Sequence, residues 1–490
     1  RPRNLPRLLK LKRTDKIEPV FLINIDKNSD IPIYRQIGDA IFRLIEDGTL
    51  KPNYRLPPIR KTAEALGVNT VTIVSAYKYL ENKKAVYSHV GSGTFVSPIL
   101  LDEIPKPVEK ENVFQNRENE HYKNASGFIN FADSSLPQKL FPTEEFKTSL
   151  NELLDREGGG AFYTVDSQGY MPLREKICSY LTDYGINTYP ENIQILSGAQ
   201  QGIDIVSKAM VSYGDVVLAE NPTFYGAAGA FISRGCRIVE IPLEDNGPDI
   251  SAIENMAKLY KPKFFYSMAY FQTPTGISCS LNKKRRILEL ADKYGFYIIE
   301  DDNLYDFNYT KSAIVPYKAL DYHNRVIYIK SFSKILMPGL RIGFAVLPNK
   351  ITQSITNAKY TTDISTSGLL QKALDIYLSK NLYKEHIEKL RLYGREQYKA
   401  AVKYCDRHLK DLCRYIKPYG GISLWIDTGI EDFKRLSQSL AQKNVIVSPG
   451  SKFLIDGSKT GYIRLCFTAV TPAKMESGIR RIAECVDSIL

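Results

Sequence analysis

Lys334 is the residue whose position most directly suggests chemistry. It follows an apolar run, residues 326–329, that predicts a buried strand, and its loop also holds Ser331, Ser333 and Arg341. Open α/β sheets bind ligands beyond the carboxyl ends of their strands. A lysine amine there can form a Schiff base with an aldehyde cofactor, and two hydroxyls with a second cation suit a phosphate. The group therefore suits a phosphate next to an imine, and a surface lysine after a strand is the alternative that this spacing alone leaves open.

The string from 331 to 344, S-F-S-K-I-L-M-P-G-L-R-I-G-F, resembles the pyridoxal-phosphate lysine segment of the fold-type I aminotransferases. The resemblance implies that Lys334 is the catalytic lysine that holds pyridoxal 5'-phosphate. It also implies that Ser331, Ser333 and Arg341 surround the cofactor phosphate.

Two further strand ends supply groups that suit this cofactor. The strand expected at 193–197 runs into Gly198, Ala199 and Gln200, where a helix begins and offers free backbone N–H groups to a phosphate. The strand expected at 296–299 ends in Glu300, Asp301 and Asp302, and a carboxylate beside a pyridinium nitrogen keeps the ring an electron sink. The resemblance places the first three residues around the phosphate, and it favours Asp301 as the acid, with Asp302 as the alternative.

Two positions are expected at the cofactor ring. The resemblance implies that Phe224 stacks on it, with Tyr225 as the alternative. In Gln272-Thr273-Pro274-Thr275-Gly276, Thr273 replaces the family asparagine that bonds the phenolic oxygen. A threonine hydroxyl donates one such bond with a shorter reach, so the cofactor is expected to bind while catalysis suffers.

Three more residues are expected at the site from the resemblance alone. Tyr163, in a Y-x5-G-Y-x2-L-R motif, corresponds to the tyrosine that reaches the phosphate of the partner subunit. The family tyrosine after the acid is either Tyr305, displaced by one place, or is lost to Leu304. Arg464, on a strand expected at 463–465, corresponds to the arginine that binds the substrate carboxylate through two parallel hydrogen bonds.

Positive charge is concentrated at the N-terminus. Residues 1–96 contain 17 Lys and Arg against 9 Asp and Glu, a balance of +8 within a total of +12. A basic module on a nearly neutral body predicts a polyanionic partner, most simply nucleic acid. A solvated basic face is the alternative that charge alone leaves open.

Hydrophobic periodicity predicts three helices in this module, at 32–46, from 56 onward, and at 70–82. Asn69 suits the N-cap of the third helix, and Val71, Val74, Tyr77 and Leu80 are expected on its buried side. Two short strands around a Gly-Ser-Gly tip complete a winged helix-turn-helix, whose third helix enters the major groove of DNA.

The strings L-P-P-I-R, A-x-x-L-G-V-N and V-G-S-G-T-F-V resemble the bacterial GntR-type DNA-binding domain over roughly residues 30–97. In that family an arginine often occupies the position of Thr70 and contacts guanine. The resemblance implies a backbone contact from Arg60. It also implies the following contacts with the grooves: Asn69, Thr70, Thr72, Ser75, Lys78, Gly91, Ser92, Gly93 and Thr94.

The rest of the chain predicts an α/β fold with a mainly parallel sheet, because strands alternate with amphipathic helices from residue 127 onward. We expect a basic arm at 1–27, the winged helix-turn-helix at 28–97, a linker at 98–126 and the aminotransferase-like effector domain, with large and small subdomains, at 127–490. Seven scattered cysteines without a C-x-x-C pair indicate free thiols in a reducing cytoplasm, and the five histidines lack metal-ligand spacing. No apolar run reaches the length of a membrane span.

Together the two halves resemble the MocR family, in which a GntR-type domain precedes a pyridoxal-phosphate-binding effector domain. The resemblance implies a cytoplasmic, homodimeric transcription regulator that binds double-stranded DNA and senses an amino compound through an external aldimine, without being primarily an enzyme. An aminotransferase with an accessory DNA-binding domain, and a sensor of pyridoxal phosphate itself, remain the alternatives.

Overall fold

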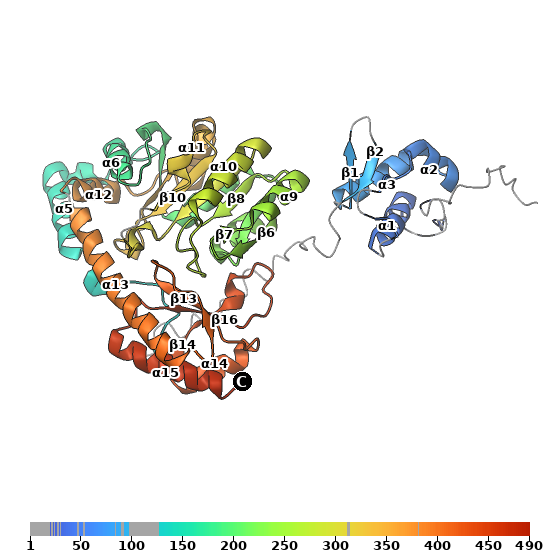
Figure 1. Ribbon diagram of the computed structural model, residues 1–490. Coiled ribbons are helices and arrows are strands. Elements are labelled where there is room, and N and C mark those ends of the chain that lie inside the picture. The colour runs from blue at the N-terminus through green and yellow to red at the C-terminus, as the bar shows by residue number, and fades with distance from the viewer. Residues whose placement is uncertain are drawn as a thin grey trace, which may run out of the picture. The chain divides into compact units, whose positions relative to one another are not determined.

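The computed structural model describes residues 20, 23, 25–26, 29, 31–46, 49–51, 54–83, 85–89, 93–97, 127–310, 314–380 and 382–490. The chain divides into two compact units, residues 1–106 and 107–490 (Figure 1). The arm expected at 1–27 lies mostly, and the linker expected at 98–126 entirely, outside the described residues, so the four domain boundaries stay predictions.

The first unit is a winged helix-turn-helix, as the periodicity predicted. Helices α1 (Ile33–Glu46), α2 (Ile59–Leu66) and α3 (Thr70–Asn82) precede an antiparallel pair, β1 (Val86–His89) and β2 (Gly93–Val96). Their buried side chains form one apolar core.

Local sequence explains how α3 begins. Gly67 ends α2 at φ +63°, a conformation that glycine adopts without strain. The Asn69 side chain accepts a hydrogen bond from the Val71 backbone N–H at 3.0 Å, so the predicted N-cap is confirmed.

The predicted buried face of α3 was partly wrong. Tyr77 and Leu80 are buried with Ile73 and Ala76, but Val71 and Val74 are 66% and 46% exposed. The helical period places 73, 76, 77 and 80 on one face, and this leaves the two valines on the opposite face. Apolar residue type suggested burial there, and the packing of α3 against α1 and α2 decided otherwise.

The second unit is built on an eight-stranded sheet in the order β4-β11-β10-β9-β8-β5-β6-β7. Neighbouring strands run parallel from β10 to β6, and β11 and β7 are antiparallel to their neighbours. The strands are β4 (Ile193–Leu196), β5 (Val216–Asn221), β6 (Arg237–Glu244), β7 (Gly247–Pro248), β8 (Phe264–Ser267), β9 (Tyr297–Asp302), β10 (Val326–Ser331) and β11 (Gly343–Val346). The predicted mainly parallel sheet is confirmed.

Helices cover both faces of this sheet (Figure 1). Successive strand residues point to opposite faces, so they divide between two apolar cores. One core packs α5 (Thr143–Glu157), α6 (Met171–Thr182), α9 (Ile250–Tyr260), α10 (Leu281–Tyr294) and α12 (Gly368–Ser379). The other packs α7 (Ala199–Met210), α8 (Tyr225–Ser233) and α11 (Asn349–Asp363).

A long helix, α13 (Leu382–His408), leads to a small subdomain (Figure 1). Its first turns pack on the large core and its last turns on a third core. That core joins a sheet in the order β12-β13-β16-β15 to two helices and to the parallel pair of β3 and β14. The elements are β3 (Ile129–Asn130), β12 (Arg414–Tyr415), β13 (Ser423–Asp427), α14 (Phe433–Gln442), β14 (Val445–Ile446), β15 (Ser448–Pro449), β16 (Tyr462–Cys466) and α15 (Pro472–Asp487).

This topology brings the ends of several strands together at one edge of the large sheet. Strands β4, β5, β8, β9 and β10 all end there, since β4 is antiparallel to β11, which is itself antiparallel to β10. The loops that leave these strands carry most of the residues expected at the cofactor. None of the helices in the described ranges is long and apolar enough to cross a membrane.

Candidate functional site

A cavity of about 570 Å³ lies where the strand ends of the large sheet meet the small subdomain. Its size suits a small-molecule ligand. Ten of the residues predicted for the cofactor or effector line it: Ala199, Gln200, Phe224, Thr273, Asp301, Ser331, Ser333, Lys334, Arg341 and Arg464. The fold thus brings together side chains that lie up to 265 positions apart in the chain (464 − 199).

Lys334 extends into this cavity from the turn after β10. Its Nζ donates to Ser134 Oγ at 2.7 Å and to the Ser134 carbonyl oxygen at 3.0 Å. Burial lowers the pKa of Lys334 from its ordinary value, and the nearby Arg464 guanidinium acts in the same direction. A lowered pKa is what an amine needs to act as a nucleophile near neutral pH.

The two candidate acids at the end of β9 face opposite sides of the sheet. Asp301 lines the cavity, and its Oδ2 accepts a hydrogen bond from Tyr266 at 2.7 Å. Its Oδ1 is buried and has no hydrogen-bond partner among the described residues. Burial raises the pKa of Asp301 to about 6.

Asp302 is fully buried on the other side, where it bonds Tyr328, the Lys330 ammonium at 2.9 Å and the Tyr305 backbone N–H at 3.1 Å. Asp301 is therefore the acid that faces the cavity.

The phosphate-binding residues cluster around Arg341. Its Nη1 donates to Ser333 Oγ at 3.2 Å, and Ser331 Oγ donates to Ser333 Oγ at 3.0 Å. Gly198 precedes α7 at φ +94°, and a Cβ there would lie 2.7 Å from Arg341 Nη2. The positive φ favours glycine here, and a side chain at this position would displace the guanidinium from the helix N-terminus. Hydroxyls, a cation and free N–H groups converge here as an oxyanion requires.

Both aromatic candidates for the ring-stacking position line the cavity. The Phe224 and Tyr225 rings lie 5.2 Å apart, and the Lys452 ammonium lies 4.7 Å from the Tyr225 ring. Tyr225 is 42% exposed, whereas Phe224 is half-buried beside the cavity. Thr273 is half-buried and also lines this cavity.

Arg464 enters the cavity from β16 of the small subdomain. Its Nη2 donates to the Ala132 carbonyl oxygen at 2.9 Å and to Ser448 Oγ at 3.2 Å, and its guanidinium lies 5.0 Å from the Phe453 ring. Its Nε is buried without a hydrogen-bond partner among the described residues. The guanidinium thus lines the cavity with hydrogen-bonding capacity left over, as a residue that binds a carboxylate requires.

Sequence reasoning missed Ser134 and Lys452, which line this cavity, and Tyr266 behind it. Ser134 accepts from Lys334, but neither Ser134 nor Lys452 lies in a motif of its own. Tyr266, the partner of Asp301, is inside a strand whose residues all resemble ordinary core. Their contacts alone connect them with the predicted site residues.

Two predicted residues lie elsewhere. Tyr163 is 77% exposed and does not line the cavity of this chain. Tyr305 lies on a second cavity, of about 690 Å³, where its ring stacks on Tyr184 with the centroids 4.0 Å apart. Its backbone N–H donates to Asp302 Oδ1 at 3.1 Å. Leu304, the residue to which the family tyrosine would be lost, is buried in the core. Among the described residues that line the first cavity, none is a tyrosine from the segment after Asp301.

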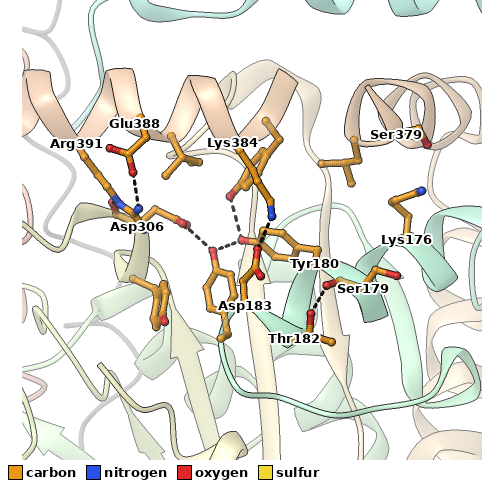
Figure 2. A pocket seen from close by; sticks show the side chains of 15 residues that line it. Lys176, Ser179, Tyr180, Thr182, Asp183, Asp306, Ser379, Lys384, Glu388 and Arg391 are labelled. Carbon is orange, nitrogen blue, oxygen red and sulfur yellow. Dashed lines mark hydrogen bonds and ion pairs between the residues drawn. The ribbon is translucent and has the colours of Figure 1, made fainter. Parts of the chain in front are cut away.

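The second cavity is formed by α6, the end of α12, the start of α13 and residues 305–306 (Figure 2). A chain of hydroxyls lines it: Tyr180 bonds both Tyr184 and Tyr383, and Tyr184 donates to Asp306 Oδ1 at 2.7 Å. Beneath them the buried Lys330 ammonium lies 2.9 Å from Asp302 and 3.0 Å from Asp306. Burial opposes its charge, but the two carboxylates outweigh burial and raise the pKa of Lys330.

The residues predicted to contact DNA belong to the first unit. Arg60, Asn69, Thr70, Lys78 and Gly93 are exposed, and Thr72, Ser75 and Thr94 are half-buried. Because Oδ1 of Asn69 caps α3, the side-chain N–H groups of Asn69 are the part that can contact DNA. The predicted wing residues Gly91 and Ser92 lie outside the described residues.

Comparisons with known proteins agree with both units. Residues 127–482 match the family described as aminotransferase class I and II, and residues 33–96 match the bacterial regulatory proteins of the gntR family. The chain therefore belongs to the aminotransferase class I and II family and carries a gntR-type DNA-binding domain in front of it. This domain order is that of the MocR family, of which the chain is a member.

Two regulators match this chain over nearly its whole length, and an aminotransferase matches three quarters of it. The chain is 27% identical to the uncharacterized HTH-type transcriptional regulator YisV of Bacillus subtilis (strain 168), over 94% of this chain and 96% of the relative. It is 26% identical to the probable rhizopine catabolism regulatory protein MocR of Rhizobium meliloti, over 94% and 95%. The kynurenine aminotransferase of Pyrococcus horikoshii is 31% identical, with a TM-score of 0.71 over 75% of this chain and 92% of that protein.

The cofactor of this family is pyridoxal 5'-phosphate, and the cavity fits its three functional ends. Lys334 meets the requirement for an amine at the aldehyde. The unpartnered Asp301 Oδ1 suits the ring nitrogen, and the close approach of Gly198 and Arg341 suits the phosphate. The residues present therefore match the cofactor that the family uses.

Proposed function

We propose that this chain is a pyridoxal-phosphate-dependent transcription regulator whose second unit senses an amino compound. One observation carries the proposal. Lys334, Asp301 and Arg464 line a single cavity in a chain that begins with a gntR-type DNA-binding domain. The amine, the acid and the guanidinium are the groups needed to hold the cofactor and the carboxylate of an amino acid.

Each residue has a distinct role in this proposal. Pyridoxal phosphate supplies an aldehyde that condenses with amines and a ring that accepts electrons. Lys334 would hold the cofactor at its aldehyde carbon, Asp301 would hold a proton at the ring nitrogen, and Arg464 would orient the carboxylate of a ligand. Ser331, Ser333 and Arg341 fix the phosphate, together with the N-terminus of α7.

Several features favour sensing over turnover. Thr273 stands where the family has an asparagine, and no tyrosine from the segment after Asp301 reaches the cavity. Each missing hydrogen bond removes a restraint on ring position, and loss of one well-placed hydrogen bond can cost ~10²-fold or more in rate. Binding tolerates such losses better than catalysis, because the covalent bond to the ligand supplies most of the hold.

For the first unit we propose contacts with double-stranded DNA. Arg60, exposed at the start of α2, contacts a phosphate, and α3 enters the major groove. Arg60→Ala is expected to weaken binding to all duplexes alike and to reduce the salt slope by about 0.9, the value for one phosphate. Loss confined to one sequence would show that Arg60 contacts a base instead.

We further propose a homodimer in the cytoplasm, in which Tyr163 completes the phosphate site of the partner subunit. Its 77% exposure, next to Phe162 at 67%, leaves an aromatic surface that a partner would cover. Mixed dimers of Lys334→Ala and Tyr163→Phe chains test this arrangement. If Tyr163 acts across the interface, both defects fall in one site of the mixed dimer and its other site is intact.

The central experiment mixes the full chain, loaded with cofactor, with a panel of amino acids and simple amines. We expect ligands to change the visible absorbance and the affinity for DNA, while keto product accumulates more slowly than about 1 s⁻¹, an ordinary enzymic rate. Sustained faster turnover would support the alternative, an aminotransferase, which the similarity to the kynurenine aminotransferase of Pyrococcus horikoshii favours. DNA affinity that responds to the cofactor but to no amine would support a sensor of pyridoxal phosphate itself.

A further inference from the structure

Helix α3 presents two valines to solvent. Val71 is 66% exposed and Val74 is 46% exposed, while the opposite face of the helix is buried in the core of the first unit. Residues 71, 74, 75 and 78 share one face of a helix, because they are spaced by three, four and seven positions. Two β-branched apolar side chains on the exposed face of a short helix are not needed for the fold, since the core is complete without them.

This face offers few polar contacts for bases. Between Thr70 and Leu80, α3 contains no Arg, Asn or Gln, so Lys78 is the one side chain of this stretch that can bond both O6 and N7 of a guanine. Lys78 is exposed and can also contact a phosphate, and Ser75 and Thr70 offer only hydroxyls. Asn69, just before the helix, uses its side-chain oxygen to cap α3.

The surroundings of the valines suit DNA better than an apolar protein surface. Residues 54–83 contain five Lys and Arg against two Glu, and Arg60, Lys61 and Lys78 are all exposed. An apolar pair inside a basic surface is complementary to a major groove, where the C5 methyl of thymine is the apolar group and phosphates flank it.

We propose that Val71 and Val74 determine operator specificity by contacting thymine C5 methyl groups in the major groove. This inference rests on the proposed DNA-binding function of the first unit. The inference predicts that the preferred DNA sites have thymines at the base pairs that the two valines contact. Burying one methyl group contributes about 0.8 kcal/mol, so each contacted thymine is expected to improve affinity about four-fold.

Replacement of thymine by uracil tests the proposal, because it removes only the methyl group. The full-length chain with pyridoxal phosphate first selects its best duplexes from a random-sequence library. Single thymines in the selected half-site are then replaced by uracil, and the affinities are measured. We expect about four-fold weaker binding at the positions that contact the valines and no change at the others.

Variants then assign each methyl group to a side chain. Val71→Ala should bring the thymine-to-uracil ratio to about one at one position only, and Val74→Ala should do so at another position. Lys78→Ala is the matched control on the same face. It should weaken thymine and uracil duplexes equally, since a lysine contacts phosphates or polar base edges. The exposed valines make no core contact, so their variants are expected to unfold at the same temperature as the parent.

The outcomes separate this inference from the proposed function. Duplex binding with a thymine-to-uracil ratio of one at every position would overturn the inference alone. A ratio that survives both valine variants would also overturn it, because another side chain would then contact the methyl groups. If the loaded chain binds no duplex at all, the proposed DNA-binding function fails and this inference fails with it.

Discussion

Asp301 and Asp302 are neighbours in the sequence, yet they belong to regions of opposite character. Asp301 faces a cavity that contains Lys334, and one of its buried oxygens has no partner among the described residues. Asp302 faces the other side of the sheet, where Lys330, Tyr328 and a backbone N–H satisfy it. The alternation of side chains along a strand is enough to separate the two.

The same contrast separates two lysines near the end of the neighbouring strand, β10. Lys330 is fully buried and paired with two carboxylates, whereas the hydrogen bonds of Lys334 within the described part of the chain go to the hydroxyl and carbonyl oxygens of Ser134. Buried polar groups are normally satisfied, so an unsatisfied buried atom of a residue that lines a cavity, such as Asp301 Oδ1, suggests the place where a ligand is expected. Residue type does not distinguish the two regions here; the partners of each acid and each lysine do.

The sharpest test of the comparison is Lys334→Ala. We expect it to abolish the cofactor adduct that borohydride fixes to the protein, because no other amine replaces the lysine at the aldehyde. Peptide mass spectrometry of the reduced protein provides the measurement. An adduct that survives on another lysine, Lys330 included, would contradict the assignment.

Lys330→Ala should have the opposite profile. It leaves Asp302 and Asp306 buried without their cation, and breaking such a pair costs about 3–5 kcal/mol of stability. Denaturant unfolding of the second unit should show this loss, while the folded fraction still fixes cofactor on Lys334. Unchanged stability together with loss of the adduct would mean that Lys330 holds the cofactor and that Lys334 does not.

Arg464→Lys sharpens the description of the effector end of the cavity. A lysine keeps the charge but not the paired hydrogen bonds of a guanidinium. Hydrogen bonds to charged groups contribute about 1.5–3 kcal/mol, so affinity for α-amino acids should fall roughly 10- to 150-fold. Amines without a carboxylate are the internal control, and their affinity should stay the same. An equal loss for both ligand types would show that Arg464 only supports the cavity wall.

The smallest effect concerns pH. In the protein without cofactor, burial raises the pKa of Asp301 to about 6, so the carboxyl is protonated below that pH and ionised above it. Only the ionised form offers a full charge to the ring nitrogen. Cofactor affinity should therefore fall as pH drops through about 6, by up to ten-fold per pH unit.

Asp301→Asn is the matched control for this pH dependence. It removes the titrating group and leaves the titration of the cofactor phosphate, whose second pKa also lies near 6. The difference between the pH profiles of cofactor affinity for the parent and for Asp301→Asn is the contribution of the Asp301 carboxyl. Parallel profiles would show that its titration does not govern binding.

Much of the fold was predictable because local physics repeats along the chain. The three helices and hairpin of the first unit, the cap at Asn69 and the mainly parallel sheet all follow from apolar spacing and turn residues. Lys334, Ser331, Ser333 and Arg341 could be grouped in advance because they lie in one loop at a strand end. Gly198 to Gln200 could be added because a helix follows a strand there.

Only the tertiary structure decided which neighbour faces which cavity. Three outcomes depend on packing partners that are distant in the sequence. Asp301 rather than Asp302 faces the first cavity, Tyr305 lines the second cavity, and Val71 and Val74 are exposed. Ser134 and Tyr266 became visible for the same reason, since their roles consist of contacts with Lys334 and Asp301. The sequence determines which residues share a face of a strand or helix, because side chains repeat with a fixed period along each element. Which face is buried and which faces a cavity or solvent is decided by the elements that pack against it.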